Sequence, residues 1–146
     1  MPIRTAYALW EGTSRDGRGK MSLGSRAYEG AYSFASRFEE GPGTNPEELI
    51  GAAHAGCFSM ALAGELNKAG YKPASIRTSA KVSVEKVDGG FEITKSELHC
   101  EAEVPDIDDE TFQKHAEAAK KGCPVSKALA GVQITLDAKL LQPVRG

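Results

Sequence analysis

The chain has 146 residues, of which 40% are hydrophobic and 26% are charged. This balance is typical of a globular protein, and we expect a single domain over residues 1–146. Its 18 basic and 20 acidic side chains leave a formal net charge of −2. No strong field of one sign therefore indicates a nucleic acid or an anionic membrane surface as a partner.

The N-terminal residues lack the apolar core of a signal peptide. The longest apolar run, residues 52–64, is interrupted by His54 and is too short to span a bilayer. We therefore expect a cytoplasmic protein. Without an export signal, the three cysteines indicate buried packing, redox chemistry or metal binding rather than a structural disulfide framework.

The first part of the chain predicts short extended segments. Alternating residues predict a strand over residues 4–10, and a turn rich in Gly, Arg and Asp follows. A second strand is expected near residues 20–25. A third short extended stretch, residues 32–38, precedes the turn sequence EEGPG.

A long helix comes next. Thr44 or Asn45 can cap its N-terminus, and Pro46 suits its first turn. Gly70 ends it. Residues 50–66 are nearly all apolar or small, which predicts a helix buried on all sides. Because so short a chain offers little cover for such a helix, we expect a partner subunit to bury its small-residue side in a symmetric dimer.

The rest of the chain predicts a hairpin, two helices and a last strand. The expected elements are a strand over 76–86, a turn at Asp88-Gly89-Gly90, a strand over 91–104, helices over 109–121 and 124–130, and a strand over 132–141. This order of elements predicts an α+β fold with mainly antiparallel strand pairing.

Cys57 lies in the interior of the long helix. Free cysteine is among the most buried residue types, and the helix dipole acts only near the helix ends. From its position alone we favour a packing role for Cys57, because a reactive thiol there needs a cation brought to it.

Cys123 precedes Pro124 at the start of a short helix, where the pKa of a thiol is lowered. Taken alone it is the better candidate nucleophile, although a small residue at a kink between two helices fits the position equally well. Cys100 lies in an alternating strand and has neither feature, so we interpret it as a packing residue.

Two blocks of sequence carry a resemblance to a known family. RFEEGPGTNPEELIGAAHAGCFSMAL and KKGCPVSKAL closely resemble the OsmC branch of the OsmC/Ohr family, whose members are thiol peroxidases that reduce hydroperoxides. The remaining strands also look like that family, so the resemblance covers nearly the whole chain. It implies the OsmC-like fold, an intertwined homodimer in which antiparallel sheets wrap two long central helices.

The resemblance also implies roles for four residues. Cys57 matches the peroxide-reacting cysteine and Cys123 the resolving cysteine, which overturns the packing role that position alone favours for Cys57. Arg37 and Glu47 match the polar residues of the family's active site. Without the motifs we would interpret these two as a solvated surface pair.

These residue types suit peroxide reduction. The thiolate is the nucleophile, and an arginine beside Cys57 would favour the charged sulfur while Glu47 held the guanidinium bidentately. The resulting sulfenic acid would react with Cys123 to form a Cys57–Cys123 disulfide, which a dithiol of lipoyl type or another thiol would reduce. No metal or organic cofactor is expected, because sulfur is the redox centre.

An organic hydroperoxide substrate needs an apolar pocket beside the sulfur. We expect Ile50, Phe58 and Met60 to contribute to this pocket.

Glu47 and Cys57 are ten residues apart, which is about 15 Å along one straight helix. They cannot share a site through the same helix. Either the helix breaks, or the Glu47 that serves a given Cys57 comes from the antiparallel helix of the other subunit. We favour the second alternative, an active site composite across the homodimer.

Three alternatives remain open. Arg15 lies in an Arg-Asp-Gly sequence that resembles the loop supplying the site arginine in the Ohr branch, so it is a rival to Arg37. A metal site built from His54, Cys57 and Cys123 is a second alternative, although no paired Cys-x-x-Cys element supports it. A non-enzymatic module that binds a small ligand in an apolar cleft is the third, and it predicts that Cys57→Ser keeps full function.

Overall fold

The computed structural model of the protein describes residues 1–141. The chain forms two compact units, Met1–Leu49 and Ile50–Gly146. The elements are β1 (Ala6–Glu11), β2 (Arg18–Leu23), β3 (Glu29–Tyr32), α1 (Phe34–Phe38), α2 (Pro46–Lys68), β4 (Ser75–Val87), β5 (Gly90–Glu103), α3 (Asp109–Gly122), α4 (Pro124–Ala128) and β6 (Gln133–Leu141). This mixture confirms the predicted α+β class, whereas the single domain stays a prediction.

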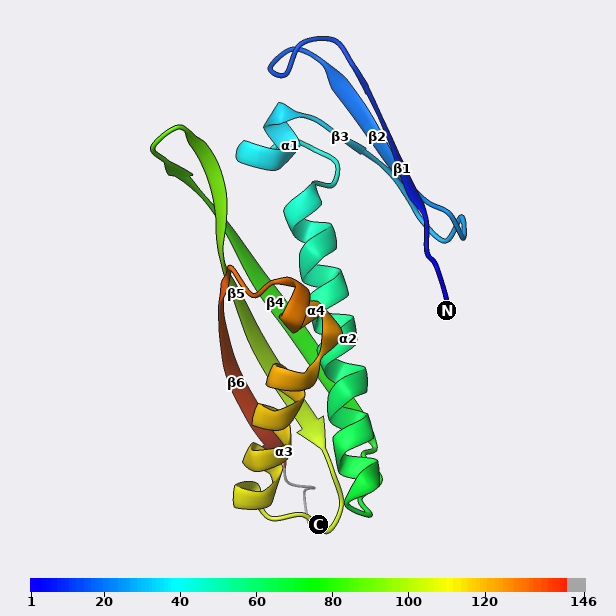
Figure 1. Ribbon diagram of the computed structural model, residues 1–146, viewed down its shortest axis with the longest axis vertical. Helices are drawn as coiled ribbons and strands as arrows, with labels where there is room; N and C mark the ends of the chain where they lie inside the picture. Colours follow the sequence, from blue (N-terminus) through cyan, green and yellow to red (C-terminus); the bar gives the residue numbers. More distant parts are fainter. Residues whose placement is uncertain (142–146) are drawn as a thin grey trace. The chain divides into compact units, whose positions relative to one another are not determined.

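The first unit holds a three-stranded antiparallel sheet in the order β1-β2-β3, followed by the short helix α1 (Figure 1). The rings of Trp10 and Tyr32 lie on one face of this sheet with their centroids 5.3 Å apart. Gly19 of β2 lies between them, and a Cβ at this position would be 2.5 Å from Tyr32 and 2.6 Å from Trp10. The aromatic pair therefore requires glycine at position 19.

The predicted extended stretch 32–38 is wrong beyond Ser33, because α1 begins at Phe34. Ser33 and Ser36 form a reciprocal capping box: the Ser33 side chain accepts from the Ser36 amide, and the Ser36 hydroxyl accepts from the Ser33 amide. The usual sequence signature of this box has Glu or Gln at the fourth position. A serine there satisfies the same amide and leaves a weaker signal in the sequence.

Helix α2 confirms the predicted long helix and runs unbroken for 23 residues. The Asn45 side chain caps it by accepting a hydrogen bond from the Glu48 amide at 2.7 Å. Gly70 ends it with a φ of 92°, and the Tyr71 amide then donates to the Leu66 carbonyl.

The second unit contains a three-stranded sheet in the order β4-β5-β6. β4 and β5 form the predicted antiparallel hairpin, which turns at Gly89 and Gly90 with positive φ at both. β6 instead pairs parallel to β5, so the expected antiparallel pairing does not extend to this strand. The physical reason is the connection: α3 and α4 carry the chain back across the sheet before β6 begins.

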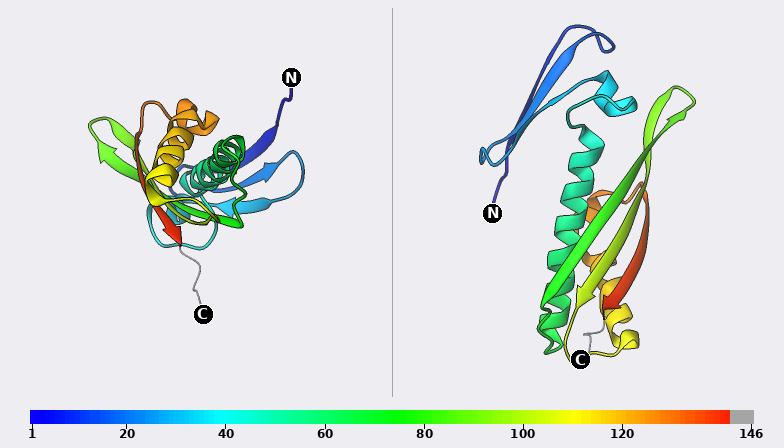
Figure 2. Two further views of the ribbon diagram at one scale, coloured as in Figure 1. Left: turned by 90° about the horizontal axis from the view of Figure 1, so that it is seen from below. Right: turned by 180° about the vertical axis from the view of Figure 1, so that it is seen from behind.

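Helices α2 and α3 pack against the same sheet in the second unit (Figure 2). Most side chains of this core are fully buried and come from three elements. The main contributors are Phe58, Leu62 and Leu66 from α2, Leu98, Cys100 and Ala102 from β5, and Phe112, Ala116 and Ala119 from α3. Cys100 lies inside this core, where a small apolar side chain packs well.

The other side of α2 is exposed in the single chain. Ala52, Ala53, Gly56 and Gly64 are exposed, and Met60 keeps 81% of its accessible surface. This is the small-residue side that we expect a partner subunit to bury, and its burial in a dimer stays a prediction.

Within the described residues, α2 is also the one helix that is long and apolar enough to cross a membrane by length and composition. The sequence analysis found the apolar run 52–64 too short to span a bilayer. That conclusion does not apply to the whole of α2, because the helix extends beyond this run at both ends. Core helices pass the same test. Because α2 contributes fully buried residues to the core, we interpret it as a core helix.

Candidate active site

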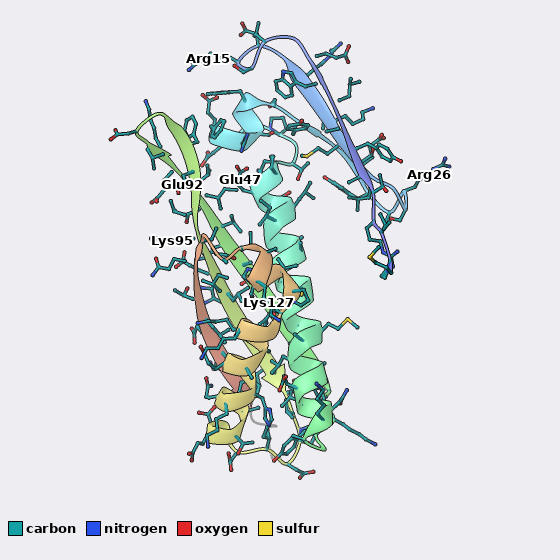
Figure 3. All side chains as sticks on the ribbon, viewed as in Figure 1. Arg15, Arg26, Glu47, Glu92, Lys95 and Lys127 are labelled. Carbon is teal, nitrogen blue, oxygen red and sulfur yellow. The ribbon has the colours of Figure 1, made fainter. Side chains whose placement is uncertain are left out.

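Arg37 and Glu47 form an ion pair between α1 and the first turn of α2. Arg37 Nε lies 2.9 Å from Oε1 and 3.3 Å from Oε2 of Glu47, and Arg37 Nη2 lies 2.8 Å from Oε1. Figure 3 labels Glu47 where α2 begins. Glu47 is only 5% exposed, so this is not the solvated surface pair that the residues without their motifs would suggest.

Local hydrogen bonds hold this pair in place. The Ser36 hydroxyl donates to the Thr44 carbonyl at 2.7 Å, and the Asn45 side-chain amide donates to the Ser36 carbonyl at 3.0 Å. These bonds tie α1 to the residues just before α2. Within the first unit, the Arg37 guanidinium and the Glu47 carboxylate are thus held close together.

Arg15, the rival arginine, has an aromatic partner instead. Arg15 lies in the loop between β1 and β2 and is labelled in Figure 3. Its guanidinium carbon is 4.8 Å from the ring centroid of Phe34. The Phe34 and Phe38 rings are 5.1 Å apart, and the Arg37 guanidinium lies 5.0 Å above Phe38. Arg15 therefore contacts α1 through Phe34, whereas Arg37, a residue of α1, is held by Glu47.

The sulfur atoms of Cys57 and Cys123 lie 2.7 Å apart, and both cysteines are free. Cys123 is fully buried and Cys57 is half-buried. A disulfide requires about 2.05 Å between the sulfurs. A shift of less than about 1 Å would therefore join these two thiols.

The turn between α3 and α4 positions Cys123. Its amide donates to the Ala119 carbonyl at 2.9 Å, which closes α3, and its carbonyl accepts from the Lys127 amide at 3.1 Å, which opens α4. Pro124 follows as the first residue of α4. Cys123 is thus the C-cap of α3 and the N-cap of α4, and its side chain contacts Cys57 on α2.

The two thiols differ in acidity. Burial raises the pKa of Cys57, and the neighbouring Cys123 thiol raises it further. Burial also acts to raise the pKa of Cys123, but hydrogen bonds from Cys57, Ser126 and Val125 outweigh it and leave the pKa below its usual range. Within the second unit the thiolate is therefore favoured at Cys123, and Cys57 needs a cation before it can be the nucleophile.

His54 is a polar group in this unit that the sequence suggested only as a metal ligand. Its side chain is fully buried, with Nδ1 2.6 Å from the Ser96 hydroxyl and Nε2 2.8 Å from the Ser126 hydroxyl. Burial lowers the pKa of His54, so the ring is neutral. Because both ring nitrogens bind hydroxyls, neither is free to hold a metal ion.

Ser96 and Ser126 are the residues that the sequence analysis missed. They are 42 and 72 positions from His54, and no local spacing predicts such contacts. The available signal was a histidine in an apolar helix, which implies that buried partners exist somewhere in the fold.

The expected apolar pocket is wrong in part. Phe58 is fully buried in the core, whereas Met60 on the same helix is 81% exposed. These two side chains do not line one cavity within the single chain. They lie on different faces of α2, because residues two positions apart on a helix are separated by about 200° of rotation.

The predicted site residues thus form two pairs, one in each unit. Arg37 and Glu47 meet in the first unit, and Cys57 and Cys123 meet in the second. α2 continues without a break from Glu47 to Cys57, so about 15 Å of helix separates them in one chain.

Comparisons with known proteins agree on one family. The family model described as OsmC-like protein matches residues 39–137. Over 138 residues the chain is 53% identical to "Peroxiredoxin OsmC" of Escherichia coli (strain K12), a match that covers 94% of this chain and 96% of that protein.

Two Ohr proteins are more distant relatives. The "Organic hydroperoxide resistance protein" of Xanthomonas axonopodis pv. citri (strain 306) is 32% identical over 98 residues, covering 66% of this chain and 67% of that protein. The crystal structure of the organic hydroperoxide resistance protein OhrB of Bacillus subtilis matches with a TM-score of 0.67 at 26% identity, over 94% of this chain and 98% of that one. The OsmC/Ohr type of fold expected for the single chain is thereby confirmed.

Proposed function

Because the chain belongs to the OsmC-like protein family, we propose that Cys57 and Cys123 carry out its reaction as a two-cysteine peroxidase. The protein is a peroxidase that detoxifies organic hydroperoxides in stress defence. The observation that carries our proposal is the distance of 2.7 Å between the two free sulfurs.

The first step oxidises Cys57. Its thiolate attacks the terminal oxygen of the hydroperoxide, the O–O bond breaks, and the alkoxide leaves as an alcohol after taking up a proton. Cys57 becomes a sulfenic acid and the peroxide is reduced by two electrons.

The second step joins the two cysteines. The Cys123 thiolate attacks the sulfenic sulfur, the S–O bond breaks, and hydroxide leaves as the disulfide forms. This protects Cys57 from further oxidation to sulfinic acid. A dithiol reductant then restores both thiols by exchange, and no metal or organic cofactor takes part.

We assign the cation that Cys57 needs to the partner subunit. α2 is unbroken, which removes the alternative of a helix break between Glu47 and Cys57. The exposed small residues on one side of α2 leave room for a second, antiparallel helix to approach closely. In such a homodimer the Arg37–Glu47 pair of each subunit serves Cys57 of the other, favouring the thiolate and donating to the departing oxygen. A cytoplasmic location remains a prediction from the sequence.

Peptide mass mapping tests the two-cysteine reaction. The reduced protein receives one equivalent of an organic hydroperoxide, its free thiols are blocked, and its cysteines are mapped. We expect a Cys57–Cys123 disulfide with Cys100 still free. Three free thiols and unconsumed peroxide would contradict the proposal and support the non-enzymatic binding module.

A mixed dimer tests the composite site. One subunit carries Glu47→Ala and the other Cys57→Ser, so an intact Cys57 and an intact Glu47 occur only in different chains. We expect this heterodimer to keep one working site, while each homodimeric variant is inactive. A heterodimer as inactive as its parents would show that the site is not shared.

A further inference from the structure

The two adjacent thiols of the second unit form a pair that one ligand atom could bridge. Cys57 Sγ and Cys123 Sγ are 2.7 Å apart, and neither belongs to a disulfide. Cys57 is half-buried, whereas Cys123 is fully buried. A reagent from solvent therefore reaches Cys57 first, and the Cys123 sulfur then lies within reach of the same reagent.

The side of α2 next to Cys57 is open in the single chain. Ala53, Gly56 and Met60 surround Cys57 on the helix surface, and all three are exposed. An added Cβ at Gly56 meets no atom within 4 Å. A group bound to the Cys57 sulfur can therefore extend toward this side of the helix.

The surroundings offer the two sulfurs no third ligand. Within residues 1–141, no group of three or more His, Cys, Asp and Glu side chains could hold a metal ion. His54, one turn before Cys57, has both ring nitrogens hydrogen-bonded to serine hydroxyls. Zinc, which takes three or four protein ligands, therefore fits this pair poorly. A suitable ligand has to be satisfied by two sulfurs.

The distance between the sulfurs selects the geometry of that ligand. A linear metal centre with bonds of about 2.3 Å to sulfur holds its two sulfurs about 4.6 Å apart. A pyramidal centre with bonds of that length at nearly right angles holds them about 3.3 Å apart. The observed 2.7 Å is much closer to the second value. Trivalent arsenic is such a pyramidal centre, and it is a soft acceptor of the kind that thiolate sulfur prefers.

We propose that Cys57 and Cys123 form a binding site for trivalent arsenicals of the type R–As=O, in which arsenic bridges the two sulfurs. The Cys57 thiol adds to arsenic first, and the Cys123 thiol closes the ring. Two arsenic–sulfur bonds form, the arsenic–oxygen bond and both S–H bonds break, and the oxygen leaves with the two protons as water. Arsenic stays trivalent and neither sulfur is oxidised, so the reaction needs no oxidant or reductant.

Ring closure makes this binding tight. The second arsenic–sulfur bond forms within one molecule, between groups that the fold already holds close together. Linking two binding events in this way raises the affinity by about 10²–10⁴. We therefore expect the loss of either thiol to weaken retention of the arsenical at least about a hundredfold.

Binding of an arsenical would also block peroxide reduction, because it occupies both reacting sulfurs. A small dithiol would restore the site by taking the arsenic away. This loss of activity rests on the proposed function. The binding itself rests only on the geometry of the two thiols.

The experiment uses phenylarsine oxide and native mass spectrometry. The reduced protein receives one equivalent of the arsenical, then an excess of the monothiol glutathione, and then dithiothreitol, and its intact mass is measured after each step. We expect one phenylarsenic group to replace two thiol hydrogens, to survive glutathione and to leave with dithiothreitol. Cys57→Ser and Cys123→Ser should each lose the group to glutathione. Cys100→Ser is the matched control, because Cys100 is a buried core thiol, and it should retain the group.

A second measurement needs no variant that folds. X-ray absorption at the arsenic edge counts the sulfur neighbours of arsenic in the unaltered protein. Two sulfur neighbours support the inference, and a single one overturns it. Removal of the group from the unaltered protein by glutathione also overturns it, as does its retention by Cys57→Ser or Cys123→Ser or its loss from Cys100→Ser.

Failure of this inference is distinguishable from failure of the proposed function. If hydroperoxide produces the Cys57–Cys123 disulfide while the arsenical is not retained, the inference alone is wrong. If the arsenical is retained while hydroperoxide leaves three free thiols, the proposed function alone is wrong.

Discussion

The sulfur atoms of Cys57 and Cys123 lie 2.7 Å apart although the two residues are 66 positions apart in the sequence. One belongs to the middle of α2 and the other to the turn between α3 and α4. The α3–α4 turn is fixed by backbone hydrogen bonds on both sides of Cys123. The pair is therefore preorganised for disulfide formation, with little conformational entropy left to lose.

Cys123→Ser should separate the two chemical steps. We expect this variant to consume the first equivalent of hydroperoxide at an undiminished rate, because Cys57 is retained. Excess peroxide should then convert Cys57 to the sulfinic acid, since no thiol resolves the sulfenic acid. Intact mass spectrometry distinguishes these states. Cys100→Ser, which alters a buried core thiol, should still form the disulfide, and a sulfinic acid in that variant would argue against the assigned pair.

Arg37→Lys and Arg15→Lys should decide between the two arginines. Lysine keeps the charge but loses the fork that binds the Glu47 carboxylate at two points. We expect Arg37→Lys to lower kcat/KM for an organic hydroperoxide about a hundredfold. Arg15→Lys should stay within about twofold, since in residues 1–141 the interaction that it alters is a cation–π contact with Phe34. The reverse order of effects would transfer the role to Arg15.

The stability of the protein should depend on pH through His54. Burial lowers the pKa of His54 in the folded state, whereas the unfolded residue titrates near 6.5. The unfolded chain therefore binds more protons in this window, and the free energy of unfolding falls as the pH drops below about 6.5. A protonated His54 ring would also have to donate from both nitrogens, so that the Ser96 and Ser126 hydroxyls would both have to accept.

Chemical denaturation across a pH series measures this dependence. His54→Gln lacks a group that titrates in this window, so its free energy of unfolding should fall less steeply than that of the unaltered protein. Parallel curves for the two proteins would mean that His54 is not the group responsible.

The exposed side of α2 should form the dimer interface. An added Cβ at Gly56 meets no atom within 4 Å in the single chain, so Gly56→Glu leaves the fold of one chain intact. In a dimer it would place a charge against the partner helix. We expect this variant to be monomeric by light scattering and to lose peroxidase activity. Ala118→Glu on the exposed face of α3 is the control and should leave the mass of the assembly unchanged.

Local sequence patterns were sufficient to predict those features whose conformation depends on interactions between residues close together in the chain. Asn45 and Gly70 bound α2 because a side-chain cap and a positive φ act within a few residues. The turn at Gly89 and Gly90 was predictable for the same reason. The capping box at Ser33 was missed because two serines resemble any polar loop.

The sequence by itself determined the α+β class, most of the elements and the family, and it selected the residues that we propose for peroxide chemistry. Only the tertiary structure decided how they meet: that Glu47 holds Arg37 rather than Arg15, that Cys123 has the more acidic thiol of its pair, and that His54 is joined to Ser96 and Ser126. Capping, turn formation and periodicity depend on neighbours in the chain. Ion pairs, desolvation and buried hydrogen bonds instead depend on distances between residues far apart in the sequence, and folding alone sets these distances.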